Sequence, residues 1–406
     1  MASFHSLYRI LTLCDTIYID FFRRKYMLNK LIAKIKKDPM LPVSILAAVI
    51  SLFITPPGKE LLGAIDWHTL GILFMMLTVL EGFKQEDLFR PLVKYSSGFS
   101  TMVSLSLFLI FGVFFTSMFV TNDVSLIIFV PLTILLFRSV GREECILPII
   151  SMENIAAIRG SLLMPFGSPQ NLFLFNSSGV GAGRFILHMA PLCVSSGILL
   201  IIFVTVYFRR EKGKKIEFKL DLVPWKKEYK ARRITYLALF VMILIVIVSR
   251  TNLWPAAVLI VIAAVLIVNR KLLRSVDYVL LVTFFCFFVF SSSITANPSI
   301  EAFLQKTVAG HEYVSVILLS QVISNVPASI VLYPFSESFA GLIYGADTAG
   351  LCSLIGSLAS VINYRIYVRE YPGRGKQFVK VFTLTSWLFF IIVVIPGYLL
   401  SQWRFF

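Results

Sequence analysis

Long apolar runs constrain this chain more than any other feature. Runs of membrane-spanning length recur from residue 41 to residue 402, and a helix of about 20 apolar residues matches the hydrocarbon thickness of a bilayer. Hydrophobic residues make up 57% of the 406 residues, charged residues only 15%, and the mean hydropathy is +0.83. A soluble globule does not have this composition. The sequence therefore predicts an all-α polytopic membrane protein, located in the cell membrane and surrounded by lipid.

Positive charge sets the expected orientation. The chain has a net charge of +16, which could suggest a nucleic-acid partner, but the basic residues gather in short loops beside the spans. Residues 1–40 carry eight Lys and Arg, and the loop 209–233 carries eleven against four acidic residues. Because cytoplasmic loops are enriched in Lys and Arg, both segments are predicted to be cytoplasmic, and no nucleic acid is expected as a partner.

The spans must thread between these two cytoplasmic segments. Residues 1–40 are expected to form an interfacial N-terminal segment. Residues 41–208 would form a first membrane half and residues 234–406 a second. The expected spans and hairpins follow the order 41–56, 66–82, hairpin 98–138, broken helix 145–176 and 185–207, then 234–249, 253–268, 277–295, hairpin 312–344, broken helix 346–367 and 379–402.

Two segments of the chain read as copies of one unit, residues 66–175 and 277–367. Each copy has a span that opens on an aspartate, a hairpin with a polar tip, and an interrupted span. The tips are Thr121-Asn122-Asp123 and Ser324-Asn325-Val326, and the interrupted segments GSLLMPFGSPQNLFLF (160–175) and CSLIGSLASVINYRIY (352–367) align without a gap. Charge counting brings the first hairpin in from the cytoplasm and the second from outside, so the repeats are predicted to have inverted topology, which is typical of secondary transporters.

The segment 98–138 has an alternative interpretation as two ordinary spans. Its 41 residues suit two full crossings. The polar triplet at its centre favours a re-entrant hairpin, because Asn and Asp side chains at membrane depth are costly unless they line a cavity.

The interrupted helices predict binding sites for both a cation and an anion. Pro165 and Pro169 remove backbone donors and free the carbonyls upstream, which can coordinate a cation. The helix N-termini that face such a break carry partial positive charge and suit an anion.

Three motifs, TNDVSLIIFVPL, GSLLMPFGSPQNLFLF and SNVPASIVL, resemble the ion transporter superfamily of sodium-coupled dicarboxylate symporters, citrate carriers and arsenite permeases. The resemblance covers roughly residues 42–402. It implies an elevator mechanism, in which a transport domain of hairpins and broken helices slides against a scaffold that forms a homodimer.

The resemblance, together with the chemistry of Asp123 and Arg159, predicts which residues bind. Sodium sites are expected at the two tips and breaks, with Thr121, Asn122, Asp123, Gly167, Ser168 and Asn171 in the first copy and Ser324, Asn325, Ser357 and Ser360 in the second. Substrate is expected between the halves, at Thr121, Asn122, Asp123, Arg159, Asn171, Ser324, Asn325 and Asn363. The coupling ion would be Na⁺ or H⁺, with no other cofactor.

Both tips depart from the Ser-Asn-Thr of the dicarboxylate branch, at Asp123 and Val326. An ionised Asp123 would repel a polyanion, so it requires a bound cation, a bound proton, or a neutral or metal-complexed substrate. Its alternative role is as a helix cap.

The sequence also predicts roles for the other charged residues. Arg159 either attracts an anion or partners an acid elsewhere, and it is too poorly phased with Glu153 to pair with it directly. Asp66 and Asp277 are predicted helix caps. Glu337 and Asp347 are expected to be solvated near the outer surface.

The leading function is a secondary active transporter that moves a small anion, a di- or tricarboxylate such as citrate or an oxyanion, coupled to Na⁺ or H⁺. The alternative is a cation/proton antiporter or an arsenite-type efflux permease on the same scaffold. A cavity-facing Arg159 would favour the anion, whereas Glu153 placed beside Asp123 would favour the cation. An integral-membrane enzyme is a third hypothesis, which the absence of any His/Asp metal cluster, GxSxG or Walker sequence disfavours.

Overall fold

A computed structural model describes residues 40–56, 63, 65–86, 99–211, 216, 230–249 and 252–403. The predicted interfacial segment 1–40 and most of the basic loop 209–233 lie outside the described residues. Every regular element in the described ranges is a helix. By length and composition, six of these helices can cross a membrane: Met102–Val120, Asn122–Ser139, Ala182–Tyr207, Lys230–Ser249, Tyr278–Thr295 and Gly375–Ser401. The predicted fold class, an all-α multi-pass membrane protein, is confirmed.

The first half contains two helices, then a helical hairpin, a broken helix and a long final helix. In chain order these are α2 (Met40–Ile54), α3 (Trp67–Gln85), α5 (Met102–Val120), α6 (Asn122–Ser139), η1 (Glu143–Cys145), α7 (Ile146–Ser161), α8 (Pro169–Ser178), α9 (Ala182–Tyr207) and η2 (Arg209–Glu211).

The second half repeats the hairpin and the broken helix. Its elements are α10 (Lys230–Ser249), α11 (Trp254–Asn269), η4 (Leu272–Arg274), α12 (Tyr278–Thr295), α13 (Pro298–Val308), α14 (Glu312–Ile323), α15 (Asn325–Leu332), η5 (Tyr333–Phe335), α16 (Phe339–Ala349), α17 (Leu358–Glu370) and α18 (Gly375–Ser401).

Equivalent aspartates begin α3 and α12. The Asp66 carboxylate accepts a hydrogen bond from the Thr69 backbone N–H at 2.9 Å, and the Asp277 carboxylate accepts from that of Val279 at 3.1 Å. Each satisfies amides that have no partner within the helix. The predicted caps are confirmed, and they mark the same point in each repeat.

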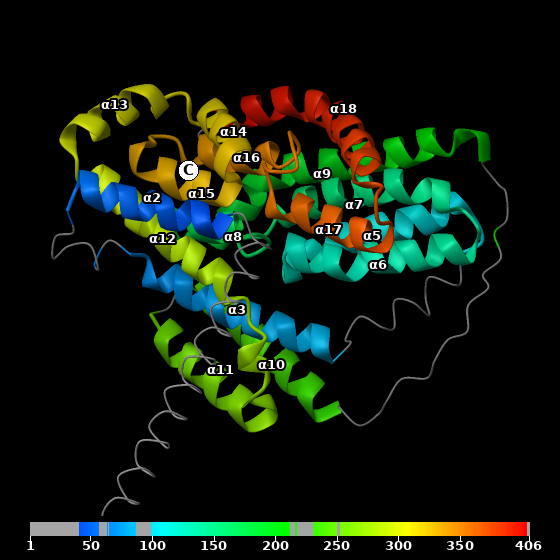
Figure 1. The fold of residues 1–406 in the computed structure, drawn as a ribbon, viewed down its shortest axis with the longest axis horizontal. Coiled ribbons are helices and arrows are strands. Elements are labelled where there is room, and N and C mark those ends of the chain that lie inside the picture. The colour runs from blue at the N-terminus through cyan, green and yellow to red at the C-terminus, as the bar shows by residue number, and fades with distance from the viewer. Residues whose placement is uncertain are drawn as a thin grey trace, which may run out of the picture.

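The helices pack in two groups (Figure 1). In one, α12 packs along α2, while α3 packs against α10 and α11. In the other, the hairpin α5–α6 packs on α7, the hairpin α14–α15 packs on α16, and α9 and α18 flank α7. The groups meet where α12 packs against α15 and α3 against α8. The hairpins and broken helices thus form one body beside the other helices.

The two helix breaks are compact because each contains a glycine that touches backbone. A Cβ added to Gly167 would lie 2.1 Å from the Ser161 carbonyl oxygen, and one added to Gly356 would lie 2.4 Å from that of Ala349. The residue after each glycine, Ser168 or Ser357, is the N-cap of the next helix. The structure therefore pairs Ser168 with Ser357, whereas the ungapped sequence alignment pairs Ser168 with Ser360.

Two further boundaries differ from the sequence expectation. The second hairpin ends with η5 at Phe335, and the broken helix begins at Phe339 rather than 346. The helix α13 was not predicted at all, although Asn297 and Pro298 are an N-cap and first-turn signal that could have revealed it.

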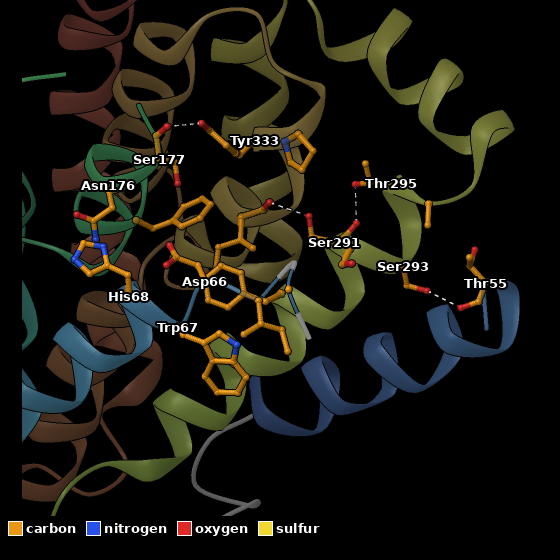
Figure 2. A pocket seen from close by; sticks show the side chains of 18 of the residues that line it. Thr55, Asp66, Trp67, His68, Asn176, Ser177, Ser291, Ser293, Thr295 and Tyr333 are labelled. Carbon is orange, nitrogen blue, oxygen red and sulfur yellow. Dashed lines mark hydrogen bonds between the residues drawn. The ribbon is translucent and has the colours of Figure 1, made fainter. Parts of the chain in front are cut away.

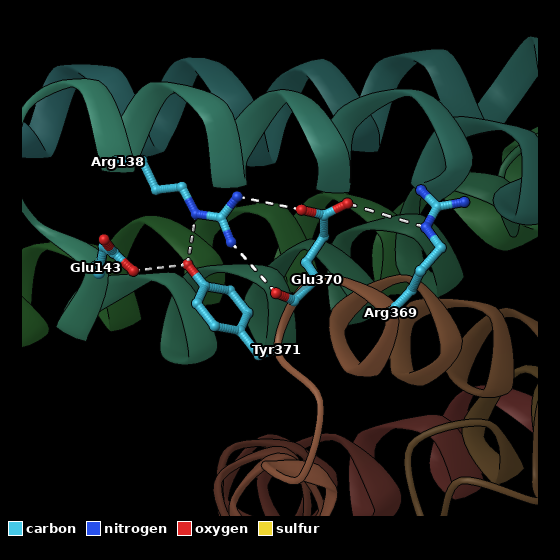
Figure 3. A network of polar contacts seen from close by, with 5 residues as sticks. All are labelled: Arg138, Glu143, Arg369, Glu370 and Tyr371. Carbon is cyan, nitrogen blue, oxygen red and sulfur yellow. Dashed lines mark hydrogen bonds and ion pairs between the residues drawn. The ribbon is translucent and has the colours of Figure 1, made fainter.

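A polar cluster joins the base of the first hairpin to the end of α17 (Figure 3). Arg138 donates to the Tyr371 hydroxyl at 2.9 Å and to the Glu370 carboxylate at 3.1 Å. Tyr371 in turn donates to Glu143 at 3.0 Å. Because these residues come from opposite halves of the chain, the cluster helps to hold the first hairpin against the second broken helix.

We predict that Gly167→Ala and Gly356→Ala each destabilise the protein by about 1–3 kcal/mol, since the added methyl group must displace a carbonyl of the preceding helix. Thermal unfolding of the purified protein in detergent measures this. Gly181→Ala is the matched control, because nothing lies within 4 Å of its added Cβ. Equal melting temperatures for all three variants would contradict the packing described.

Candidate ion and substrate site at the helix breaks

Both hairpin tips adopt the same unusual backbone conformation. Thr121 has φ 73° and ψ 154°, and Ser324 has φ 71° and ψ 159°. These are the only described residues other than glycine with positive φ. Such a conformation costs roughly 1–3 kcal/mol per residue and persists only where the surroundings enforce it. The two tips are therefore structurally equivalent, as the sequence repeat predicted.

Each tip is held by a hydrogen bond to a break. The Asn122 backbone N–H donates to the Gly167 carbonyl at 3.2 Å, and the Asn325 N–H donates to the Gly356 carbonyl, also at 3.2 Å. Gly167 lies between α7 and α8, so the first tip meets that broken helix at its interruption. α5 and α6 are each long enough to cross a membrane, and the tip between them contacts the break. That residues 98–138 form a re-entrant hairpin stays a prediction.

Four helix N-termini converge in pairs at these contacts, α6 with α8 and α15 with α17. Thr121, Ser324 and Ser357 make no side-chain capping bond, whereas Ser168 accepts from the Asn171 N–H at 3.4 Å. In α6 the Asp123 N–H donates to the Asn122 side chain at 2.9 Å. The first-turn amides that have no such partner carry partial positive charge, which suits an anion.

Carbonyl groups supply the opposite polarity. The Asn171 amide donates to the Ser161 and Leu162 carbonyls at 3.3 and 3.5 Å, while its own Oδ1 has no partner and is buried. In the second break, the Asn325 amide donates to the Ala346 carbonyl at 3.2 Å. Each break therefore gathers the oxygen atoms that a small hard cation prefers.

The two breaks are also joined to each other. The Asn154 amide of α7 donates to the Ser360 hydroxyl at 3.0 Å, and the Asn363 amide donates to the Ile150 carbonyl at 2.7 Å. Sequence reasoning missed Asn154, because its partner lies in the other repeat. Of the predicted residues, Ser360 and Asn363 thus contact α7, while Thr121, Asn122, Gly167, Ser168 and Asn171 gather at the first break and Ser324, Asn325 and Ser357 at the second.

Asp347 is completely buried, which corrects the expectation of a solvated residue. It lies in the last turn of α16, and its Oδ1 accepts from the Gln170 amide of α8 at 3.1 Å, while Oδ2 has no partner. Glu337 is exposed, as expected. The error arose because α16 begins earlier than the sequence suggested.

Arg159 is also completely buried, and none of its three guanidinium nitrogens makes a hydrogen bond. Its electrostatic neighbours include Tyr313 and Asp347. Arg159 comes from the first repeat and Asp347 from the second, so the buried positive charge lies within reach of an acid on the equivalent broken helix. Arg159 does not line the cavity between the two helix groups, which is described below.

Asp123 and Glu153 occupy separate environments. Asp123 is half-buried in the first turn of α6 and has Asp277, at the start of α12, as an electrostatic neighbour. Glu153 is buried and accepts a hydrogen bond from Thr133, farther along α6. Eleven residues separate Asn122 from Thr133, which corresponds to roughly 16 Å of helix, so Glu153 does not join the tip.

A cavity of about 1090 Å³ lies between the two helix groups, close to one end of α3 and α12 (Figure 2). Its walls come from α2, α3 and α12 on one side and from α8, α15 and η5 on the other. Asn176 donates to Thr69 at 3.1 Å and Tyr333 to the Ser177 carbonyl at 2.7 Å, so the groups touch at its edge. The cavity is lined by polar residues that include Asp66, His68, Asn176, Ser291, Ser293, Thr295 and Tyr333.

The family model described as "Citrate transporter" matches residues 31–347. The chain belongs to the citrate transporter family. The transporter is 32% identical to the inner membrane protein YbiR of Escherichia coli over 325 residues, which are 78% of this chain and 84% of YbiR. It is 29% identical over 353 residues to the uncharacterized transporter MJ0456 of Methanocaldococcus jannaschii, covering 85% of this chain and 92% of that protein.

A solved structure shares the fold of the transporter. The YdaH transporter of Alcanivorax borkumensis, described as having an unusual topology, superposes with a TM-score of 0.56 at 14% sequence identity. The match covers 86% of this chain and 88% of the YdaH chain. The likeness concerns the fold alone.

We predict that Arg159 and Asp347 are energetically coupled across the two repeats. Removing one member of a buried pair leaves an uncompensated charge, which costs about 3–5 kcal/mol, whereas removing both costs less. Arg159→Leu and Asp347→Leu should each lower thermal stability more than the double variant does. Additive losses in this double-mutant cycle, measured by thermal unfolding in detergent, would show that the two charges act independently.

Proposed function

We propose that this member of the citrate transporter family is a secondary active transporter that moves a small anion, a di- or tricarboxylate such as citrate or an oxyanion, coupled to Na⁺ or H⁺. The observation that carries the proposal is the pair of equivalent tip-to-break contacts, Asn122 to Gly167 and Asn325 to Gly356. Each contact places helix N-termini beside freed carbonyls. One site of this kind can hold an anion and a cation together, as coupled transport requires.

Anion recognition in this proposal rests on amides and hydroxyl groups. The N-terminus of α17, which has no side-chain cap, offers backbone N–H groups that suit carboxylate or oxyanion oxygens. At α6 and α15 the Asn122 and Asn325 N–H groups already donate to the breaks, and the Asp123 N–H donates to the Asn122 side chain. Arg159 contributes at a distance, because it is buried away from the main cavity near Asp347. The name of the family supports a carboxylate, and citrate is the first ligand to examine.

Asp123 supplies the coupling. Its carboxylate lies at the N-terminus of α6. There its negative charge offsets the positive potential of the helix dipole, which would otherwise attract a substrate anion. Binding of Na⁺ or H⁺ neutralises this charge and so permits the anion to bind. The cation and the anion then load together, and neither loads well alone.

The packing into two helix groups supports an elevator movement. The hairpins and broken helices would move as one body against α2, α3, α10, α11 and α12, which would form the scaffold of a homodimer. With residues 1–40 and 209–233 cytoplasmic, Asp66 and Thr295 stand at the outer ends of α3 and α12. The cavity between the groups would then open toward the outside.

The alternative, a cation/proton antiporter or arsenite-type efflux permease, is favoured by one observation. Asp123 has an acid, Asp277, rather than a base as its electrostatic neighbour. A pair of acids of this kind can exchange cations without any anionic substrate.

A screen of purified protein separates these proposals. A ligand that binds the folded state raises its melting temperature by mass action. Citrate, succinate, sulfate and arsenite are each added with and without sodium at two pH values, and hits are followed by uptake into proteoliposomes. Sodium- or proton-dependent stabilisation by an anion supports anion transport. Stabilisation by cations alone, with no effect of any anion, would favour the antiporter.

We predict that Asp123→Asn abolishes ion-driven accumulation of the anion while the protein still folds, because the neutral side chain no longer requires a cation. Uptake into proteoliposomes with and without an imposed ion gradient measures the effect. Glu337→Gln is the control, since Glu337 is an exposed acid that does not line the cavity. Gradient-driven uptake that is unchanged in Asp123→Asn would remove Asp123 from the coupling mechanism.

A further inference from the structure

We propose that the cavity between the two helix groups binds an organic ammonium ion, with its charged head beside Asp66 and its apolar part against the aromatic rings of Phe173, Phe288 and Tyr333. A free amine and the ethanolamine headgroup of a lipid both present this chemistry. The site is separate from the proposed transport site, because no described residue of the hairpin tips or helix breaks lines the cavity.

The charge at the cavity is negative. Asp66 lines it from the start of α3 (Figure 2). Among the described residues, no Lys or Arg lines the cavity or forms an ion pair with Asp66, although the chain has 38 Lys and Arg against 22 Asp and Glu. The carboxylate accepts hydrogen bonds from the backbone N–H and the hydroxyl of Thr69, which leaves about two of its roughly four acceptor positions for a ligand. Asp66 therefore offers a cation a charge that no basic side chain compensates.

The hydroxyl groups that line the cavity have their hydrogen atoms engaged elsewhere. Ser291, Ser293 and Thr295 of α12 each donate to a backbone carbonyl, at 3.2, 2.7 and 2.8 Å. Tyr333 donates to the carbonyl of Ser177 at 2.7 Å. A hydroxyl whose hydrogen is engaged offers a ligand only the lone pairs of its oxygen. Because an anion needs donors, these walls disfavour citrate and oxyanions and suit a cation.

The cavity also has aromatic walls. The centroid of the Phe173 ring lies 5.6 Å from that of Phe288 and 5.5 Å from that of Tyr333, and Asp66 is an electrostatic neighbour of Tyr333. Aromatic rings attract cations, and quaternary ammonium ions are recognised in this way. The cavity volume of about 1090 Å³ suits an organic molecule and is far larger than a metal ion requires. The acid, the rings and the volume together favour an organic ammonium ion over an anion or a metal cation.

A ligand in this cavity contacts both helix groups. Phe288 belongs to α12, on the side of α2 and α3, whereas Phe173 belongs to α8, in the body of hairpins and broken helices. A bound ammonium ion therefore stabilises the present arrangement of the two groups. If the groups move against each other during transport, the ligand lowers the maximal rate of anion uptake without raising the KM for the anion. This consequence rests on the proposed function, whereas the binding itself does not.

Thermal unfolding of the purified full-length protein in detergent tests the binding, since a ligand of the folded state raises the melting temperature. The probe is phenyltrimethylammonium, and benzyl alcohol and benzenesulfonate are the controls, because they carry a similar ring with no charge or a negative one. The measurement is made at pH 8, where histidine is ordinarily neutral, because His68 also lines the cavity. Phenyltrimethylammonium should raise the melting temperature, and the two controls should not.

Two matched variants locate the site. Asp66→Asn keeps a good helix cap but removes the charge, so it should raise the apparent Kd for phenyltrimethylammonium by about tenfold or more. Asp277→Asn makes the same change at the equivalent cap of α12, which does not line the cavity, and should bind as the wild type does. Short-chain phosphatidylethanolamine and phosphatidylglycerol, added in place of the amine, distinguish the two sources. Stabilisation by phosphatidylethanolamine alone of these lipids, lost in Asp66→Asn, assigns the site to a lipid headgroup.

Equal stabilisation by all three aromatic probes would overturn the inference, because it would show that only the ring is recognised. Equal affinities of the wild type and Asp66→Asn for phenyltrimethylammonium would also overturn it. A protein that transports no anion in proteoliposomes but binds the ammonium ion through Asp66 would support the site and reject the proposed function. The two failures are therefore distinguishable.

Discussion

The hydrogen bond from each hairpin tip to the carbonyl of a helix break is the interaction on which the rest of the structure depends. Without it, Asn122 and Asn325 would leave backbone amides unpaired at membrane depth, which is costly where no water can replace the partner. The bond fixes the strained conformation of Thr121 and Ser324, and it requires a glycine-containing break of one shape. The hairpin and the broken helix are therefore one unit, and neither can be repositioned alone.

Buried charge is the second constraint, and it divides the charged residues by role. Arg159 and Asp347 are both enclosed, come from different repeats and are electrostatic neighbours. Asp123, by contrast, is half-buried at a hairpin tip. Enclosed charges cannot exchange their surroundings without a movement of the helices around them, whereas a half-buried acid is accessible to an ion.

The sequence predicted those features that depend on local pattern. The tips, the glycine-rich breaks, the capping roles of Asp66 and Asp277 and the membrane class all follow from residue types at short range. It did not predict contacts between the repeats, because Asn154 with Ser360 and Gln170 with Asp347 are separated by 206 and 177 residues. The ungapped register also failed, since the two breaks differ in length and an alignment scores matching Ser and Asn residues without knowing which serine caps the helix. The burial of Asp347 was missed for a related reason, because α16 begins before the span that hydropathy suggested.

Symmetry of the backbone and asymmetry of the side chains serve different ends in this fold. Two inverted units with the same tip geometry can present equivalent surfaces to opposite sides of the membrane, which is the structural condition for alternating access. The side chains at the tips are not symmetric, since Asp123 of the first unit stands against Val326 of the second. An acidic side chain at only one of two equivalent backbone positions gives the two tips different electrostatics while the repeated backbone is retained.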